Sequence, residues 1–203
     1  MDLPPSNKSY QDVNYWNERY SVEENYDWFK TYKDFVHLLE RHVKKTDRIL
    51  MLGCGNSSLS ESMYNDGYKH IVNVDFSDIV LKKMNQRLPS MEWITMDIKH
   101  LAFLARSFDV VIEKGTLDAL LVDEDVWHIS DKGAEMMSQI MENVHHVLSQ
   151  TGKFISVTFA QPHFRLPLIR KTFWEVNYET FGDGFHYFFY VANMKTESPE
   201  GER

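Results

Sequence analysis

The sequence predicts an α/β fold in which helices cover both faces of a doubly wound, mostly parallel sheet. Three observations support this prediction. Short apolar segments alternate with segments of helical length from residue 48 onwards. The apolar segments are nearly continuous rather than alternating, which is typical of strands buried on both faces. Glycines follow the first apolar segment and separate the last two.

The N-terminal part is expected to be helical over residues 10–43, with a break around residues 21–26. Apolar residues at helical spacing form one face of its second half: Phe29, Tyr32, Phe35, Val36 and Leu39. Residues 1–9 and 195–203 are polar and contain proline, so we expect both ends to be flexible. No linker or repeat is evident. We therefore expect residues 1–203 to form a single domain with a helical lid at 10–43.

The remaining elements follow in alternation. Strands are expected at 48–53, 70–76, 91–97, 108–115 and 152–160. Helices are expected at 56–67, 78–88 and 134–148, and Gly67 and Pro89 end the first two. Residues 174–194 contain two β-rich segments around Gly182-Asp183-Gly184, which predicts a hairpin with one strand antiparallel to its neighbour.

The composition excludes several classes of protein. The chain has 22 Lys and Arg against 30 Asp and Glu, and this net charge of −8 argues against direct nucleic-acid binding. Its single cysteine, Cys54, fits a reducing compartment. No stretch approaches the roughly 20 apolar residues of a membrane span, and no signal segment is evident. No histidine pair has metal-ligand spacing with a third ligand nearby. We therefore expect a cytoplasmic protein without membrane or metal partners.

Ligands of doubly wound sheets bind beyond the carboxyl ends of the strands, so the residues there are the candidate site. Gly53 and Gly55 follow the first strand and leave room for a ligand beside the backbone. A tight strand-to-helix turn alone would also explain them. Ser58 stands where a dinucleotide motif has its third glycine, which counts against a nicotinamide cofactor.

Acidic residues follow the next two strands. Asp75 comes 22 residues after Gly53, the spacing of a ribose-binding acid, and Ser77 is better placed than Asp75 to cap the next helix. Asp97 can accept a hydrogen bond from an adenine amine while Ile98 holds the ring, although Asp97 could equally cap a short helix. Together these strand ends predict a pocket for an adenosine.

The N-terminal segments YWNERY and YDWF are rich in aromatic residues. Trp16, Tyr20 and Trp28 either belong to a helix packed over the sheet or enclose a cation or a ring. The sequence favours neither interpretation.

Several segments resemble the seven-strand, S-adenosylmethionine-dependent methyltransferases, and the nearest group is the lysine methyltransferases of elongation factor 1-alpha. The segments are YWNERY, YDWF, LGCGNSSLS, VDFS, EKGTLDALL, PHF and GDGFHYFFY, within about residues 15–193. The resemblance implies a Rossmann-like sheet of seven strands, with the last strand antiparallel and inserted, S-adenosyl-L-methionine as cofactor, and a lysine of elongation factor 1-alpha as acceptor. It places the cofactor against Trp16, Tyr20, Trp28, Gly53, Asp75, Asp97, Ile98 and Lys114.

Methyl transfer to lysine requires a neutral amine held in line with the methyl group. Glu113 ends the fourth strand and Asp118 lies one turn further on. Our hypothesis is that Asp118 positions the acceptor amine while Glu113 and Lys114 form the edge of the cofactor site. The alternatives are a helix N-terminal acid for Asp118 and an ion pair with a nearby acid for Lys114.

Three competing functions remain open from the sequence. The first is a small-molecule methyltransferase that uses the same cofactor. The second is a nicotinamide oxidoreductase, which Ser58 disfavours. The third is a catalytically silent binding module that keeps the pocket.

Overall fold

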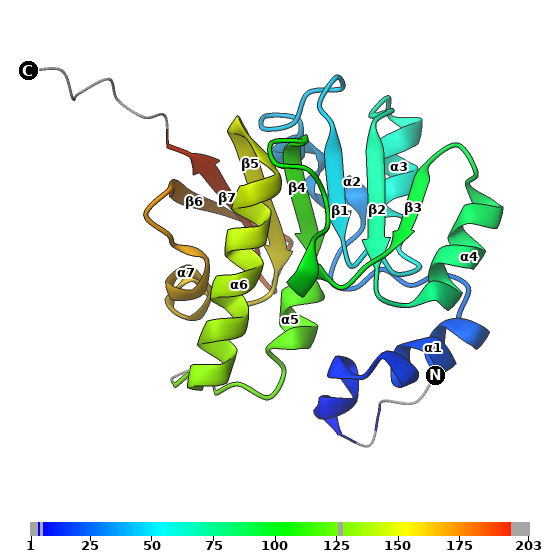
Figure 1. Ribbon diagram of the computed structural model, residues 1–203, viewed down its shortest axis with the longest axis horizontal. Coiled ribbons are helices and arrows are strands. Elements are labelled where there is room, and N and C mark those ends of the chain that lie inside the picture. The colour runs from blue at the N-terminus through cyan, green and yellow to red at the C-terminus, as the bar shows by residue number, and fades with distance from the viewer. Residues whose placement is uncertain (1–3, 5, 126–127, 196–203) are drawn as a thin grey trace, which may run out of the picture.

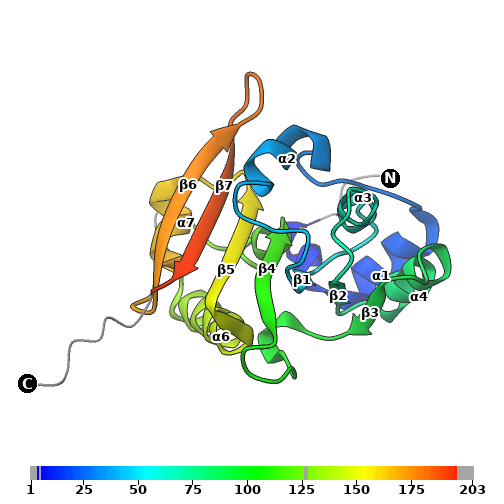
Figure 2. The ribbon, with the colours of Figure 1, turned by 90° about the horizontal axis from the view of Figure 1, so that it is seen from above.

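The computed structural model describes residue 4 and residues 6–125 and 128–195. Seven strands form one sheet in the order β3-β2-β1-β4-β5-β7-β6 (Figures 1 and 2). Strands β1 to β5 pair in parallel, whereas β7 lies between β5 and β6 and is antiparallel to both. The prediction of a mostly parallel, seven-stranded sheet with an inserted antiparallel C-terminal strand is therefore confirmed.

The strands lie close to their predicted positions. They are β1 (Ile49–Leu52), β2 (Ile71–Asp75), β3 (Glu92–Thr95), β4 (Phe108–Lys114), β5 (Leu148–Thr158), β6 (Trp174–Phe181) and β7 (Tyr187–Met194). Every residue of β1 and β2 is buried, as expected for central parallel strands. Strand β5 begins earlier than predicted because its register against β4 shifts between the pairs Phe108–Leu148 and Val110–Lys153.

Helices cover both faces of the sheet. They are η1 (Asn7–Gln11), α1 (Val13–Val22), α2 (Tyr32–Leu39), α3 (Leu59–Asn65), α4 (Asp78–Arg87), η2 (Ile98–His100), α5 (Thr116–Leu120), α6 (Asp131–Val147) and α7 (Pro162–Ile169), where η denotes a 3-10 helix. Helices α2, α3 and α4 contribute to one apolar core, and α5, α6 and α7 to the other. Figure 2 shows α2 and α6 on opposite sides of the sheet.

The N-terminal segment differs from the expected helical lid over 10–43. Helix α1 lies beyond the carboxyl ends of the strands (Figure 1), whereas α2 packs Phe35 and Leu39 into a core. The break between them is wider than predicted, and Phe29 lies within it rather than on the face of α2. Residues 7–11, partly expected to be flexible, form η1. Of the expected flexible ends, residues 1–3, 5 and 196–203 lie outside the described residues.

Two short helices, α5 and α7, were not among the predicted elements. Both follow the carboxyl end of a strand, α5 after β4 and α7 after β5. Among the described residues, no helix combines the length and the apolar character needed to cross a membrane.

Candidate active site

A cavity of about 940 Å³ lies at the carboxyl ends of the strands. This volume is at the upper end of the range of small-molecule sites. Ten of the eleven predicted site residues line it: Trp16, Tyr20, Trp28, Gly53, Gly55, Asp75, Asp97, Ile98, Lys114 and Asp118. Glu113 is not among the lining residues. The sheet thus brings together side chains that are up to 102 residues apart, from Trp16 to Asp118.

The glycine turn after β1 is packed closely against two other elements of the protein. Gly53 and Gly55 have φ values of 61° and 50°, which favour glycine. A Cβ atom on Gly53 would lie 2.3 Å from Thr116 Oγ1, and one on Gly55 would lie 2.7 Å from the Tyr20 hydroxyl. The turn is therefore fitted against both α5 and α1.

Asp75 holds this turn in place from β2. Its two carboxylate oxygens accept hydrogen bonds from the amides of Gly55, at 2.9 Å, and Ser77, at 3.0 Å. Burial raises the pKa of Asp75 to about 6. Each oxygen keeps a further lone pair, so Asp75 can still accept a ribose hydroxyl. Ser77 caps α4 through Val80 N, as its position predicted.

Asp97 caps a short helix, as one of its two predicted roles required, and also lies at the cavity. It caps η2 by accepting from the Lys99 amide at 2.9 Å, and it forms an ion pair with Lys99 Nζ at 3.1 Å. It also lines the cavity beside Ile98, which is buried. A carboxylate and an apolar surface therefore lie together where an adenine is expected.

The aromatic residues in and after α1 surround a cation of the protein itself, the guanidinium of Arg19. Trp16 stacks on Tyr20 at 5.4 Å between ring centroids. The guanidinium of Arg19 lies 5.0 Å from the ring of Trp28 and is paired with Glu23 at 2.9 Å. Arg19 was not predicted from the sequence, although its spacing of three residues from Trp16 places both on one helical face.

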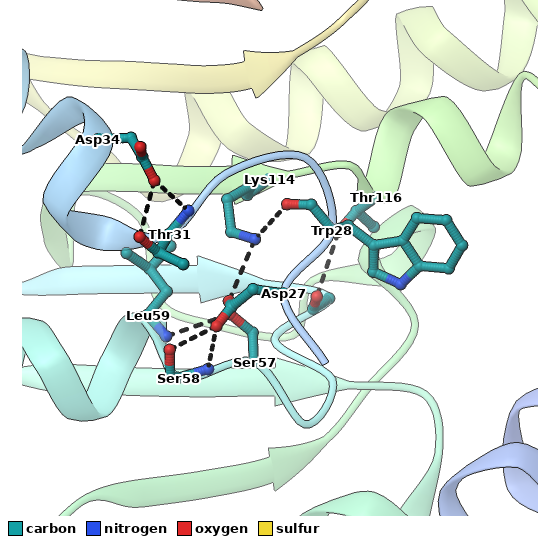
Figure 3. A network of polar contacts seen from close by, with 10 residues as sticks. Asp27, Trp28, Thr31, Asp34, Ser57, Ser58, Leu59, Lys114 and Thr116 are labelled. Atoms are coloured by element: carbon teal, nitrogen blue, oxygen red, sulfur yellow. Dashed lines mark hydrogen bonds and ion pairs between the residues drawn. The ribbon is translucent and has the colours of Figure 1, made fainter. Parts of the chain in front are cut away.

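Lys114 is tied to the segment that precedes α2 (Figure 3). Its Nζ donates to the carbonyl of Trp28 at 2.7 Å and lies 3.4 Å from Asp27 Oδ1. Its side chain is only 4% exposed. Burial lowers the pKa of Lys114, and the nearby Asp27 carboxylate opposes that shift. The alternative of an ion pair for Lys114 is thus present in the structure, and its partner Asp27 is a residue that the sequence analysis did not single out.

Glu113 is fully buried beneath α5. Its carboxylate accepts hydrogen bonds from the Ser156 hydroxyl and from Leu117 N, the latter at 3.1 Å. Burial raises the pKa of Glu113 to about 7, with Arg165 lowering it and Asp118 raising it. Glu113 does not line the cavity, so it can affect an acceptor only indirectly, through its hydrogen bond to Leu117 of α5.

Asp118 belongs to a buried polar cluster. Its Oδ1 accepts from Thr158 Oγ1 at 2.6 Å and from Arg165 Nη2 at 2.8 Å. Its Oδ2 is buried and has no hydrogen-bond partner among the described residues, and the same holds for Arg165 Nε and Nη1. Arg165 is fully buried in α7, a helix that the sequence analysis did not predict. Only the position of PHFR after the fifth strand could have indicated it.

No group of three or more His, Cys, Asp or Glu residues suited to a metal ion occurs within the part of the chain that the structure describes.

The comparisons with known proteins agree with this architecture. Residues 49–152 match the family model of a methyltransferase domain. A solved structure of a Pyrococcus horikoshii OT3 protein has a TM-score of 0.64 at 21% identity, over 88% of this chain and 99% of that one. A SAM-dependent methyltransferase from Methanosarcina mazei has a TM-score of 0.61 at 16% identity, over 79% and 98%. The fold and the matched domain define a methyltransferase whose cofactor is S-adenosylmethionine.

Two relatives narrow the class. EEF1A lysine methyltransferase 4 of Bos taurus is 41% identical over 97% of this chain and 80% of its own length. The human eEF1A lysine and N-terminal methyltransferase is 35% identical over 79% of this chain and 23% of its own length. The chain belongs to the eEF1A lysine methyltransferase family.

The cavity residues fit the cofactor of that family. Gly53 and Gly55 line the cavity at the first turn, and the buried carboxylate of Asp75 has lone pairs for ribose hydroxyls. Asp97 and Ile98 offer an acceptor and an apolar surface. These groups need no phosphate, in keeping with a nucleoside ligand.

Proposed function

We propose that this protein is a cytoplasmic, single-domain protein-lysine N-methyltransferase that acts on translation elongation factor 1-alpha. The observation that carries the proposal is the extent of the cavity. It runs from Asp97 after β3 to Phe159 after β5, and on to Phe185 in the β6–β7 turn. The part beside Gly53, Asp75 and Asp97 suits the cofactor, and the other end carries the aromatic rings of Phe159 and Phe185. The names of the relatives support the acceptor that we propose.

The cofactor is held, in this proposal, by residues of both halves of the chain. Gly53 and Gly55 offer their backbone, Asp75 accepts from the ribose, and Asp97 and Ile98 bind the adenine. Trp16, Tyr20 and Trp28 cover the site from the N-terminal side, and Lys114 fixes Trp28 through its carbonyl. We therefore place the lid within residues 7–29 and assign α2 to the core.

The bound cofactor supplies an electrophilic methyl group on its sulfonium. The protein must present a neutral amine to it, although a free lysine has a pKa of about 10.4 and its deprotonation at pH 7 costs roughly 4–5 kcal/mol. Burial among apolar side chains lowers that cost because it destabilises the ammonium. An isolated carboxylate beside the amine would raise the cost of deprotonation, because it stabilises the ammonium. Arg165 Nη2 lies 2.8 Å from Asp118 Oδ1 and opposes this effect of the carboxylate.

Asp118 is proposed to orient the acceptor amine from the first turn of α5, where it lines the cavity. Contact with the amine requires its covered Oδ2 to become accessible when the acceptor enters. Glu113 is proposed to act indirectly, because its bond to Leu117 N fixes the residue that precedes Asp118.

The test is to incubate the protein and an Asp118→Asn variant with radiolabelled cofactor and purified elongation factor 1-alpha. Mass spectrometry then locates the methylated residue. We expect label on a lysine of the acceptor with the wild-type protein and a loss of about 10²-fold or more with the variant, at unchanged cofactor affinity. Label confined to small solutes from a cell lysate would instead identify a small-molecule methyltransferase. Undiminished transfer by the variant would remove the role of Asp118.

A further inference from the structure

The segment Asp27-Trp28-Phe29 joins the two halves of the cavity and carries a strained residue. Phe29 has a φ of 65°, in the left-handed region that bulky residues seldom adopt. Such a conformation persists only when its surroundings enforce it, and strained residues of this kind cluster at functional sites. The contacts of the segment identify what enforces it.

Asp27 anchors the segment to the glycine turn and to β4 at once (Figure 3). Its Oδ1 accepts from the Ser57 hydroxyl at 2.5 Å, and its Oδ2 accepts from the Ser58 hydroxyl at 2.5 Å. Lys114 Nζ lies 3.4 Å from Oδ1 and bonds to the next carbonyl, that of Trp28. The side chains of Asp27 and Lys114 are 11% and 4% exposed. The segment is thus fixed by buried, charged hydrogen bonds immediately before Phe29.

This fixation places the ring of Phe29 over Gly115. A Cβ atom on Gly115 would lie 3.1 Å from Phe29 Cε2, so the space left by the missing side chain is filled by this ring. The ring also packs edge-on against Phe159 at 5.2 Å between centroids. Phe29, Phe159 and Phe185 all line the cavity, and we call these three residues the aromatic wall. Phe159 and Phe185 are 47% and 59% exposed, which is high for phenylalanine.

The aromatic wall suits a lysine side chain. Ring faces attract the ammonium group and pack against the methylene stem, while their apolar surface removes water from the amine. Trp28, which also lines the cavity, already has the guanidinium of Arg19 5.0 Å from its ring centroid. Among the described residues, no Lys or Arg side chain lies over a ring of the aromatic wall. The nearby Lys30 lies over the ring of Tyr187 instead. The wall therefore remains available to an incoming cation.

We propose that Phe29 is a specificity-determining residue that receives the acceptor lysine, and that Asp27 is a positioning residue that holds it there. The proposal rests on the protein-lysine methyltransferase function proposed above. Because Asp27 bonds to Ser57 and Ser58 as well as to Lys114, the same residue links the cofactor turn to the acceptor side of the cavity.

The first experiment compares Phe29→Leu and Phe29→Tyr in steady-state methylation of elongation factor 1-alpha. Leucine keeps an apolar side chain but removes the ring, whereas tyrosine keeps the ring. We expect Phe29→Leu to raise KM for the acceptor about tenfold, the size of effect given by a desolvated ring contact. Phe29→Tyr, which keeps the ring, should have a KM close to that of the wild type. Cofactor affinity, measured by calorimetry, is expected to stay within twofold. Tyr178→Leu is the matched control, because Tyr178 is 46% exposed and does not line the cavity.

The second experiment tests the anchor with Asp27→Asn, and Asp78→Asn serves as a control at an exposed ion pair. We expect Asp27→Asn to raise KM for the acceptor as Phe29→Leu does, to weaken cofactor binding severalfold through Ser57 and Ser58, and to accelerate amide exchange in peptides covering residues 23–31. The double variant Asp27→Asn/Phe29→Leu should raise KM little more than Phe29→Leu alone, because Asp27 acts through Phe29.

The outcomes separate the two proposals. If the wild-type protein binds S-adenosylmethionine but methylates no lysine, the proposed function fails whatever the variants do. If the wild-type protein methylates lysine and Phe29→Leu has an unchanged KM, the role of the aromatic wall is overturned. Unchanged amide exchange in Asp27→Asn would overturn the anchoring role.

Discussion

Because Asp118 is paired with Arg165, a substitution at Asp118 affects the stability of the protein as well as its activity. Arg165 is fully buried and its ion pair with Asp118, at 2.8 Å, is the one it forms among the described residues. Removing one member of a buried pair leaves the other charge uncompensated in an apolar environment. A loss of activity in Asp118→Asn could therefore arise from instability rather than from the loss of a group that orients the amine.

A double variant separates these effects. We expect Asp118→Asn and Arg165→Met each to lower the free energy of unfolding by about 3 to 5 kcal/mol. The double variant should be less destabilised than the sum, because neither charge is then left alone. Denaturant unfolding measures the stabilities. If Asp118 orients the amine, methyl transfer by the double variant stays low although part of the stability is recovered. Recovery of transfer together with stability would assign Asp118 to structure alone.

The buried carboxyl of Glu113 makes a separate prediction about pH. Burial raises its pKa to about 7 in the folded protein, against about 4.3 in an unfolded chain. Between these values the folded state keeps a proton that the unfolded state releases, so the contribution of Glu113 is fully present below pH 4.3 and is lost as the pH rises through 7. Unfolding free energies of wild type and Glu113→Gln at several pH values test this. Their difference should change by up to about 1.4 kcal/mol per pH unit between pH 5 and 7. A constant difference would contradict the prediction.

At the scale of elements, the turn between β1 and α3 depends on its contact with α5. Gly53 and Gly184 both have positive φ values, 61° and 80°, but only Gly53 has a neighbour that a Cβ would meet. Alanine at either position suffers backbone strain of about 1 kcal/mol. Alanine at Gly53 must in addition displace Thr116.

We therefore expect Gly53→Ala to be about 1 to 3 kcal/mol less stable than Gly184→Ala, as measured by denaturant unfolding. Cofactor affinity should fall in Gly53→Ala, because Thr116 begins α5 and moves with the turn, and should stay unchanged in Gly184→Ala. Equal stabilities of the two variants would show that the close approach of Thr116 is not what requires glycine.

The elements that the sequence predicted are those with a simple period. Strand β1 is apolar throughout, β2 and β4 are mostly apolar, and α6 has a continuous helical pattern between clear ends. Helix α7 was missed because Pro162 and Pro167 give it the composition of a loop, although Pro162 occupies a position in the first turn where proline is tolerated. Helix α5 has only five residues, too few to show a period.

At the scale of the whole molecule, the topology explains how much of the site could be predicted. Parallel strands bring their carboxyl ends to one edge, so Gly53, Asp75 and Asp97 could be grouped without knowing any contact. Arg165 and Asp27 could not, because a buried charge is recognised only by what surrounds it. The left-handed backbone conformation of Phe29 could not be predicted either. It depends on Lys114, which is 85 residues further along the chain.

The cavity joins residues of the N-terminal segment to the ends of five strands, so cofactor binding should stabilise the molecule as a whole. A ligand at 100 times its Kd that binds only the folded state adds about 2.7 kcal/mol. For a chain of this size, that corresponds to a rise in Tm of roughly 5–10 °C. Thermal unfolding with S-adenosylmethionine and with NAD provides the comparison. Only the first should raise Tm, because Ser58 stands where the dinucleotide-binding motif has its third glycine. A Trp16→Ala/Tyr20→Ala variant should show a smaller shift than wild type if α1 covers the bound cofactor. An undiminished shift would place the lid elsewhere.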